Sequence, residues 1–206
     1  MNITDTPSTR NITRLFRTAT TEQIVAGAAW YEDAYAVASA LAVKNGVTVE
    51  IAAGVIAAVS PLNSWGANVN LAARILAAGG LSSGYLTLGL NKATAILKGA
   101  DILKTLNGEK ISNFYLSIVS QGRKGVCIDR HSWSLSVNVR YAEGNIPNIK
   151  GKRYAAAVAA HVQAAKILSR EYGFEITPAQ VQSVTWKLWR AKFWAEGAYD
   201  SFEDVL

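Results

Sequence analysis

The segment that decides how this chain folds runs from residue 105 to residue 133 and reads TLNGEKISNFYLSIVSQGRKGVCIDRHSW. It begins with a tight turn at Asn107-Gly108, and the residues after this turn predict a helix over 109–121. A basic loop and a short apolar run then lead to Asp129, a residue type that caps helix N-termini. The segment therefore predicts two helices that follow turns, the second one capped by Asp129 and continuing to Tyr141.

The rest of the chain also has the apolar spacing of helices. Asn-Gly, Gly-Gly and Pro-containing turns separate the segments. The further helices that we expect cover residues 20–46, 48–59, 64–79, 91–103, 154–172 and 178–194. Residues 80–90 predict a loop or a short strand. The chain is thus predicted to be all-α, with about nine helices and almost no strand pattern.

A length of 206 residues is compatible with one domain or two small ones. The Gly/Asn/Pro-rich link over residues 144–151 is the plausible boundary. We expect residues 1–46 and 151–206 to pack as one lobe and residues 47–150 to form a central helical lobe, with a cleft between them.

Composition excludes several classes of protein. Cys127 is the single cysteine, which rules out an internal disulfide, a four-cysteine zinc site and a cysteine-ligated iron–sulfur cluster. His131 and His161 lie thirty positions apart and do not form a ligand motif, so we expect no metal and no cofactor. The N-terminus has no apolar signal region, and the longest apolar run, 51–59, is too short for a membrane span. These features predict an intracellular, cytoplasmic protein.

The chain has a formal net charge of +6 and a pI of about 9.5. Residues 91–153 carry eleven Lys and Arg against four Asp and Glu, a net charge of +7. A basic excess indicates a nucleic acid or an anionic membrane as partner, and a solvated surface is the plain alternative. The motifs within this stretch favour nucleic acid.

Those motifs resemble the helix-hairpin-helix DNA glycosylases, the superfamily of endonuclease III and 8-oxoguanine glycosylase. Ile128-Asp129-Arg130-His131 is similar to their Val-Asp-x-His motif, and Lys110, nineteen residues before Asp129, falls on their nucleophilic lysine. Residues 89–93 resemble the segment before their hairpin, and the resemblance covers roughly residues 50–142. The hairpin departs from the family pattern Leu-Pro-Gly-Val-Gly, because it is one glycine shorter and lacks the proline. The C-terminal helix resembles small phage-encoded proteins, so the chain is identified as a possible phage member.

The resemblance implies a fold and a set of roles. It implies a glycosylase-like helical bundle, with Asp129 stabilising positive charge at the sugar C1′ atom and Lys110 attacking that atom. The implied DNA-binding residues are Asn63, Lys92, Gly108, Arg123, Lys124, Arg130 and His131. The implied base pocket contains Trp65, Tyr85, Phe114 and Trp133. DNA is the expected partner, in the nucleoid or in the host cytoplasm if the chain is phage-encoded, and no protein partner or membrane is indicated.

Each of these residues also has a plainer explanation. Asp129 can be only a helix cap, Lys110 a surface lysine and His131 a buried core residue. Trp186 and Trp189, at helical spacing, indicate core packing rather than base stacking. The functional hypothesis is an N-glycosylase, with or without AP lyase activity, that flips a modified or damaged base and cleaves its glycosidic bond. The alternatives are a phage transferase that hypermodifies thymine on the same fold, and a helical DNA-binding module without catalysis.

Overall fold

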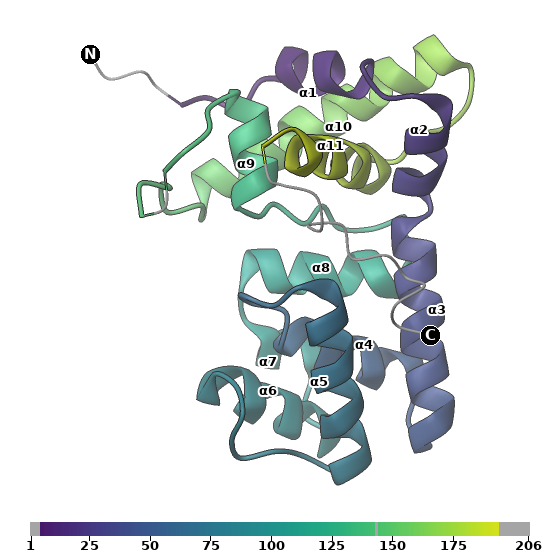
Figure 1. Ribbon diagram of the computed structural model, residues 1–206, viewed down its shortest axis with the longest axis vertical. Coiled ribbons are helices and arrows are strands. Elements are labelled where there is room, and N and C mark those ends of the chain that lie inside the picture. The colour runs from purple at the N-terminus through teal and green to yellow at the C-terminus, as the bar shows by residue number, and fades with distance from the viewer. Residues whose placement is uncertain (1–4, 143, 194–206) are drawn as a thin grey trace. The chain divides into compact units, whose positions relative to one another are not determined.

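The computed structural model describes residues 5–142 and 144–193, and these are all-helical, with eleven α-helices and no strand (Figure 1). The chain divides into two compact units. The first unit comprises residues 5–30, 122–142 and 144–193, and the second unit comprises residues 31–121. Among the described helices, none is by itself long and apolar enough to cross a membrane, and only a sharply bent pair, Thr21–Asn45 with Val49–Ala58, reaches that length and apolarity together.

The first unit is built from five helices that come from both ends of the described chain. They are α1 (Thr9–Phe16), α2 (Thr21–Ala28), α9 (Arg130–Val137), α10 (Lys152–Tyr172) and α11 (Pro178–Phe193). Local signals start two of them. Thr20 and Gln23 form a reciprocal capping box at α2, and Thr177 caps α11, whose first residue is Pro178.

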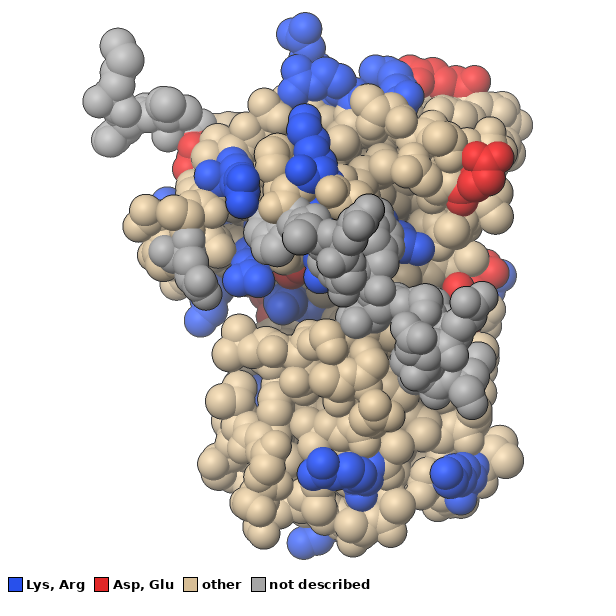
Figure 2. Space-filling view, viewed as in Figure 1, with Lys and Arg blue, Asp and Glu red and all other residues tan. Residues whose placement is uncertain are grey.

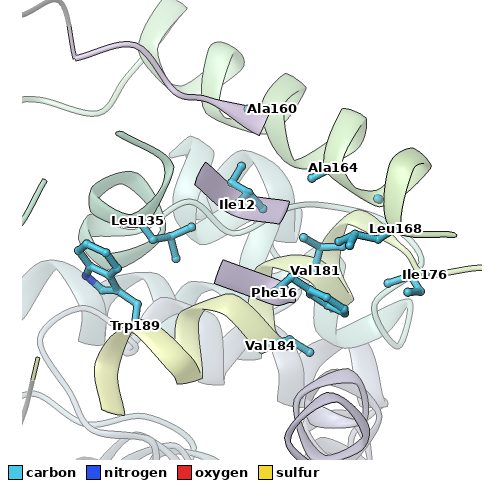
Figure 3. Close-up of a cluster of buried hydrophobic side chains, with 11 residues drawn as sticks. Ile12, Phe16, Leu135, Ala160, Ala164, Leu168, Ile176, Val181, Val184 and Trp189 are labelled. Carbon is cyan, nitrogen blue, oxygen red and sulfur yellow. The ribbon is translucent and has the colours of Figure 1, made fainter. Parts of the chain in front are cut away.

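The core of the first unit lies where α1, α9, α10 and α11 meet. Ile12 and Phe16 of α1 are completely buried against small residues of α10 and against Val181 and Val184 of α11 (Figure 3). The alanines of α10 allow this close approach of helices. The sequence did not predict α1, because its N-terminal segment is polar and its two large apolar residues are buried by partners that are distant in the chain.

A second cluster in the first unit fixes the segment that precedes Asp129. The Tyr154 hydroxyl donates to the carbonyl of Val126 at 2.8 Å and accepts from the backbone N–H of Ile128 at 3.1 Å. Ile128 and Trp133 pack with Tyr154 in the same buried cluster. Buried backbone groups of residues 126–128 are thereby paired, and the start of α9 is held against α10.

The second unit is organised around one apolar helix. Its elements are α3 (Trp30–Asn45, from Tyr31 onward), α4 (Val49–Ala58), α5 (Trp65–Ala78), α6 (Thr87–Leu97), α7 (Ile102–Leu106) and α8 (Glu109–Val119). Residues 52–58 of α4 are all buried, and α4 packs on α5, α6, α7 and α8. Thr48 and Ser64 cap the N-termini of α4 and α5, and Gly79 ends α5 in the left-handed conformation.

Several expected helix bounds are wrong. The single helix expected over 20–46 is divided at Ala29 into α2, which ends at Ala28, and α3, which begins at Trp30. Residues 87–97 form α6, and α7 is a separate short helix capped by Asp101. The helix after Asp129 ends at Val137 rather than Tyr141. There Asn138 turns left-handed, while Ser8 N–H and the Asn11 amide of the α1 region donate to Ser136 O at 2.9 and 3.0 Å.

The division into units also differs from the expected lobes. Residues 31–46 group with the central helices, and residues 122–142 and 144–150 group with the terminal ones. The reason lies in α9, which packs on α1, α10 and α11. The two expected catalytic residues consequently belong to different units, Asp129 to the first and Lys110 to the second.

Candidate functional site around Asp129

The Asp129 carboxylate lies at the N-terminus of α9 and accepts three N–H hydrogen bonds. Its Oδ1 accepts from the backbone N–H groups of His131 and Ser132 at 2.9 and 2.8 Å, and its Oδ2 accepts from Trp186 Nε1 at 2.8 Å. The backbone bonds are those of a helix cap, and the third bond comes from a different helix, α11. The three donors stabilise the negative charge of the carboxylate and fix its orientation.

The aromatic and cationic groups around Asp129 form a layered arrangement. The His131 and Trp186 rings meet edge to face, with centroids 6.2 Å apart. Arg190 lies on the Trp186 ring, with Cζ 4.5 Å from the centroid. Arg130 Nε donates to His131 Nε2 at 3.2 Å.

One stripe of α11 holds this arrangement against α9. Gln182, Trp186 and Arg190 follow each other at intervals of four residues and therefore share one helix face. Gln182 Nε2 donates to Ser132 Oγ at 3.0 Å, and both side chains are buried. Sequence reasoning missed Trp186 and Arg190 as site residues, although the Gln-x3-Trp-x3-Arg spacing was a readable signal.

Basic residues are concentrated in the first unit. Its described residues hold fifteen Lys and Arg against five Asp and Glu, a net charge of +10, whereas residues 31–121 hold six against five, a net charge of +1. On the face drawn in Figure 2, the blue side chains gather mainly over the elements of the first unit. Arg123, Lys124 and Arg130 are exposed. Thr177 Oγ1 donates to Gly122 O at 2.8 Å and so fixes the loop that carries Arg123 and Lys124.

The other expected DNA-binding residues lie in the second unit. Lys92 is half-buried, and its ammonium donates to the backbone carbonyl of Leu106, so the expected contact with DNA is replaced by an internal one. That bond anchors the end of α7 just before Gly108, which starts α8 in an extended conformation. Lys110 is an exposed residue in the first turn of α8, whereas a Schiff-base lysine needs surroundings that favour the neutral amine.

The turn at residues 60–63 presents a leucine rather than an asparagine. Leu62 is 89% exposed and has a φ of 62°, a backbone conformation that is strained for a leucine. Asn63 is half-buried, and its amide donates to Val59 O at 2.9 Å. The Tyr85 hydroxyl donates to Pro61 O, and burial raises the pKa of Tyr85, which keeps it a donor.

The expected base-pocket aromatics are mainly packing residues. Trp133 is completely buried in the first unit, and Trp65 and Phe114 are 8% and 9% exposed in the second unit. Trp133 packs with Ile128 and Tyr154. The Tyr85 hydroxyl donates to Pro61 O. All four aromatic residues thus have a packing or hydrogen-bonding role inside their own units.

Two further features bear on the kind of site. Among the described residues, no three His, Cys, Asp or Glu side chains gather closely enough to hold a metal ion. An open hollow of about 630 Å³ lies in the second unit, between residues 79–82 and the face of α6 that carries Asn91 and Lys98. That hollow contains none of the predicted site residues.

Together these features define an all-helical protein with a basic unit that fixes a carboxylate at a helix N-terminus. The chain belongs to a family of unknown function, DUF7178, whose family model matches residues 1–193. No curated protein and no solved structure matches the chain.

Proposed function

We propose that the protein is a DNA base-processing enzyme of the N-glycosylase type, which binds nucleic acid through the first unit. The observation that supports this most is the Asp129 carboxylate, held by three N–H donors within a unit whose described residues carry a net charge of +10. The cations of this unit attract the phosphate backbone of a nucleic acid. A carboxylate held in a fixed orientation among them is suited to stabilise positive charge that develops in a reaction.

The chemistry assigns Asp129 an electrostatic role. When the bond between base and sugar breaks, the base leaves with the electron pair and positive charge develops at C1′ and the ring oxygen. A carboxylate already oriented by its donors stabilises that charge without reorganisation. A water molecule then adds at C1′ and releases a proton to solvent. Extruding the base from the stack costs a few kcal/mol.

The position of Lys110 favours water over lysine as the nucleophile. Lys110 is exposed, and its attack on C1′ requires the neutral amine. The AP lyase activity is accordingly the less supported part of the proposal.

A second candidate function is a DNA-binding module without catalysis. It is favoured by the same three hydrogen bonds, since a carboxylate that is fully engaged as a helix cap satisfies a structural role as well. Asp129→Asn separates the two candidates, because asparagine caps helices as well as aspartate does but carries no charge.

The test is base release from oligonucleotides carrying modified or damaged bases, single-stranded and duplex, with nucleoside mass spectrometry and borohydride trapping. We expect free base from the wild type and at least about a 100-fold slower release from Asp129→Asn. Asp101→Asn is the matched control, since Asp101 caps α7 through a bond from Lys104 N at 2.8 Å. Equal release by wild type and Asp129→Asn, or no release on any substrate, refutes the proposal. An altered base with an intact glycosidic bond supports the transferase instead.

A further inference from the structure

Arg190 is a cation of α11 that lies on the ring of Trp186, the residue that donates to Asp129. It is half-buried on α11, and its Nε is inaccessible to solvent and has no hydrogen-bond partner among the described residues. The guanidinium rests on the Trp186 ring, with Cζ 4.5 Å from the centroid. A guanidinium that lies on an aromatic ring gains cation–π attraction and retains its planar set of N–H donors.

The neighbouring charged groups are already engaged. The Asp129 carboxylate accepts its three N–H bonds, none of them from Arg190. Arg130 Nε donates to His131, and Lys187 Nζ donates to the carbonyl of Ala26 at 3.2 Å. Within the described residues, no carboxylate lies within ion-pair distance of Arg190.

We propose that Arg190 is a phosphate-binding residue, with the Trp186 ring as the floor of the site. A planar guanidinium donates two parallel N–H bonds to a phosphate, and its stacking on an aromatic ring fixes the direction of these donors. The net charge of +10 on the described residues of the first unit favours an anion over a neutral ligand. The phosphate is a phosphodiester of nucleic acid, and this choice of source rests on the proposed function.

The position of the site gives it a specific task. Trp186 contacts both groups, since its Nε1 donates to Asp129 and its face carries Arg190. A phosphate held by Arg190 is thus placed one indole away from the carboxylate that acts on the sugar. Binding of the backbone and orientation of Asp129 are coupled through one side chain of α11.

The experiment measures the affinity of the full-length protein for a labelled single-stranded oligonucleotide as a function of salt. We expect Arg190→Gln to weaken binding about tenfold or more at low salt and to lower the slope of log K against log salt by about 0.7. Arg190→Lys keeps the charge without the planar fork and is expected to recover only part of the affinity. Arg170→Gln, in the last turn of α10 in the same unit, is the matched control and should change binding less than twofold.

Parallel titrations with inorganic phosphate and with a 5′-mononucleotide identify the source. Binding of the oligonucleotide that depends on Arg190 supports the phosphodiester, and binding of inorganic phosphate alone that depends on Arg190 supports a free phosphate. If Arg190→Gln binds all three probes as the wild type does, the proposal is overturned. Trp186→Phe keeps the aromatic floor and should retain the affinity, while it removes the donor to Asp129 and slows base release. Absence of base release by the wild type, with Arg190-dependent binding intact, counts against the proposed function and leaves the phosphate site standing.

Discussion

The two units differ in how many polar side chains they bury. Among the described residues, eleven polar side chains are buried; nine lie in the first unit and two, Asn68 and Ser117, in the second. Seven of the nine sit on α9 and α11, the helices that hold Asp129 and Trp186. Burying polar groups costs stability unless they are paired. Their concentration on α9 and α11, the polar seam of the first unit, therefore indicates a functional role for these helices beyond core packing.

The distribution of charge follows the same division. Counted along the chain, the basic excess lay in residues 91–153, but this window crosses the boundary between the units at residues 121 and 122. The described second unit is nearly neutral, and the first unit carries +10 because the loop at 122–125 folds with helices from both termini. A basic excess in the sequence indicates an anionic partner, but the fold determines on which surface the basic residues are concentrated.

Charge reversal in each unit tests most directly whether DNA binds through the basic residues of the first unit. We expect Arg123→Glu with Lys124→Glu, in the first unit, to weaken DNA binding by roughly several hundred-fold at low salt, since two phosphate contacts are lost and two repulsions added. Lys98→Glu with Lys104→Glu in the second unit, also exposed, should weaken it less than about tenfold. Fluorescence anisotropy with one labelled oligonucleotide measures both. Equal losses from the two pairs would show that the division of charge has no role in binding.

The buried His161 should make the first unit sensitive to acid. Burial lowers its pKa from 6.5 to about 4, whereas the unfolded chain takes up this proton near pH 6.5. As the pH falls from 6.5 to 4, only the unfolded state gains the proton, so the free energy of unfolding falls by about 3 kcal/mol from this group.

Urea unfolding at pH 7 and pH 4 measures this contribution. Between the two pH values, the free energy of unfolding of His161→Leu should fall by about 3 kcal/mol less than that of the wild type, because leucine has no group to protonate. The carboxylates contribute equally to both proteins and cancel in the difference. The same loss in both would mean that His161 is protonated as easily in the folded protein as in the unfolded one.

Local signals predicted the elements, and tertiary contacts decided the rest. The caps Thr48, Ser64 and Asp129 and the Thr177-Pro178 start are set by residues within one turn of each helix, so the sequence was sufficient for them. The end of α9 was not predictable in this way, since α1, more than a hundred residues earlier, supplies the donors to Ser136.

The candidate site shows the same limit. Asp129 is recognisable from its own segment, but its third donor, Trp186, comes from a helix 57 residues later. Trp133, four residues after Asp129, had the more suggestive position and is completely buried. Burial depends on which helices pack together, and no local pattern distinguished the two tryptophans.

A glycine in each unit tests how tightly the helices pack there. An added Cβ at Gly27 would lie 2.6 Å from Val184 Cγ2 and 2.8 Å from its Cα, so α2 and α11 would have to separate. We expect Gly27→Ala to lower the free energy of unfolding by about 1–3 kcal/mol. At Gly54 in α4 the nearest atoms are the side-chain methyl groups of Ile102 and Ile96, at 3.1 and 3.2 Å, which can shift. The helix propensity of alanine offsets that cost, so Gly54→Ala should be within about 1 kcal/mol of the wild type. A reversed order in urea unfolding would contradict the tight α2–α11 contact.

The smallest expected effect separates two buried serines, one in each unit. Ser183 Oγ of α11 donates to Gly27 O of α2 at 2.7 Å, a bond between helices, whereas Ser117 Oγ donates to Asn113 O within α8 at 2.8 Å. Replacing Ser183 by alanine removes a tertiary bond and leaves a carbonyl with one partner fewer, while Ser117→Ala removes a local bond that slightly disfavours its own helix. Both changes gain the same helix propensity, so the difference between their effects on the free energy of unfolding isolates the tertiary bond at about 1 kcal/mol. Equal effects would mean that the polar seam of the first unit contributes no more to stability than a hydrogen bond inside a helix.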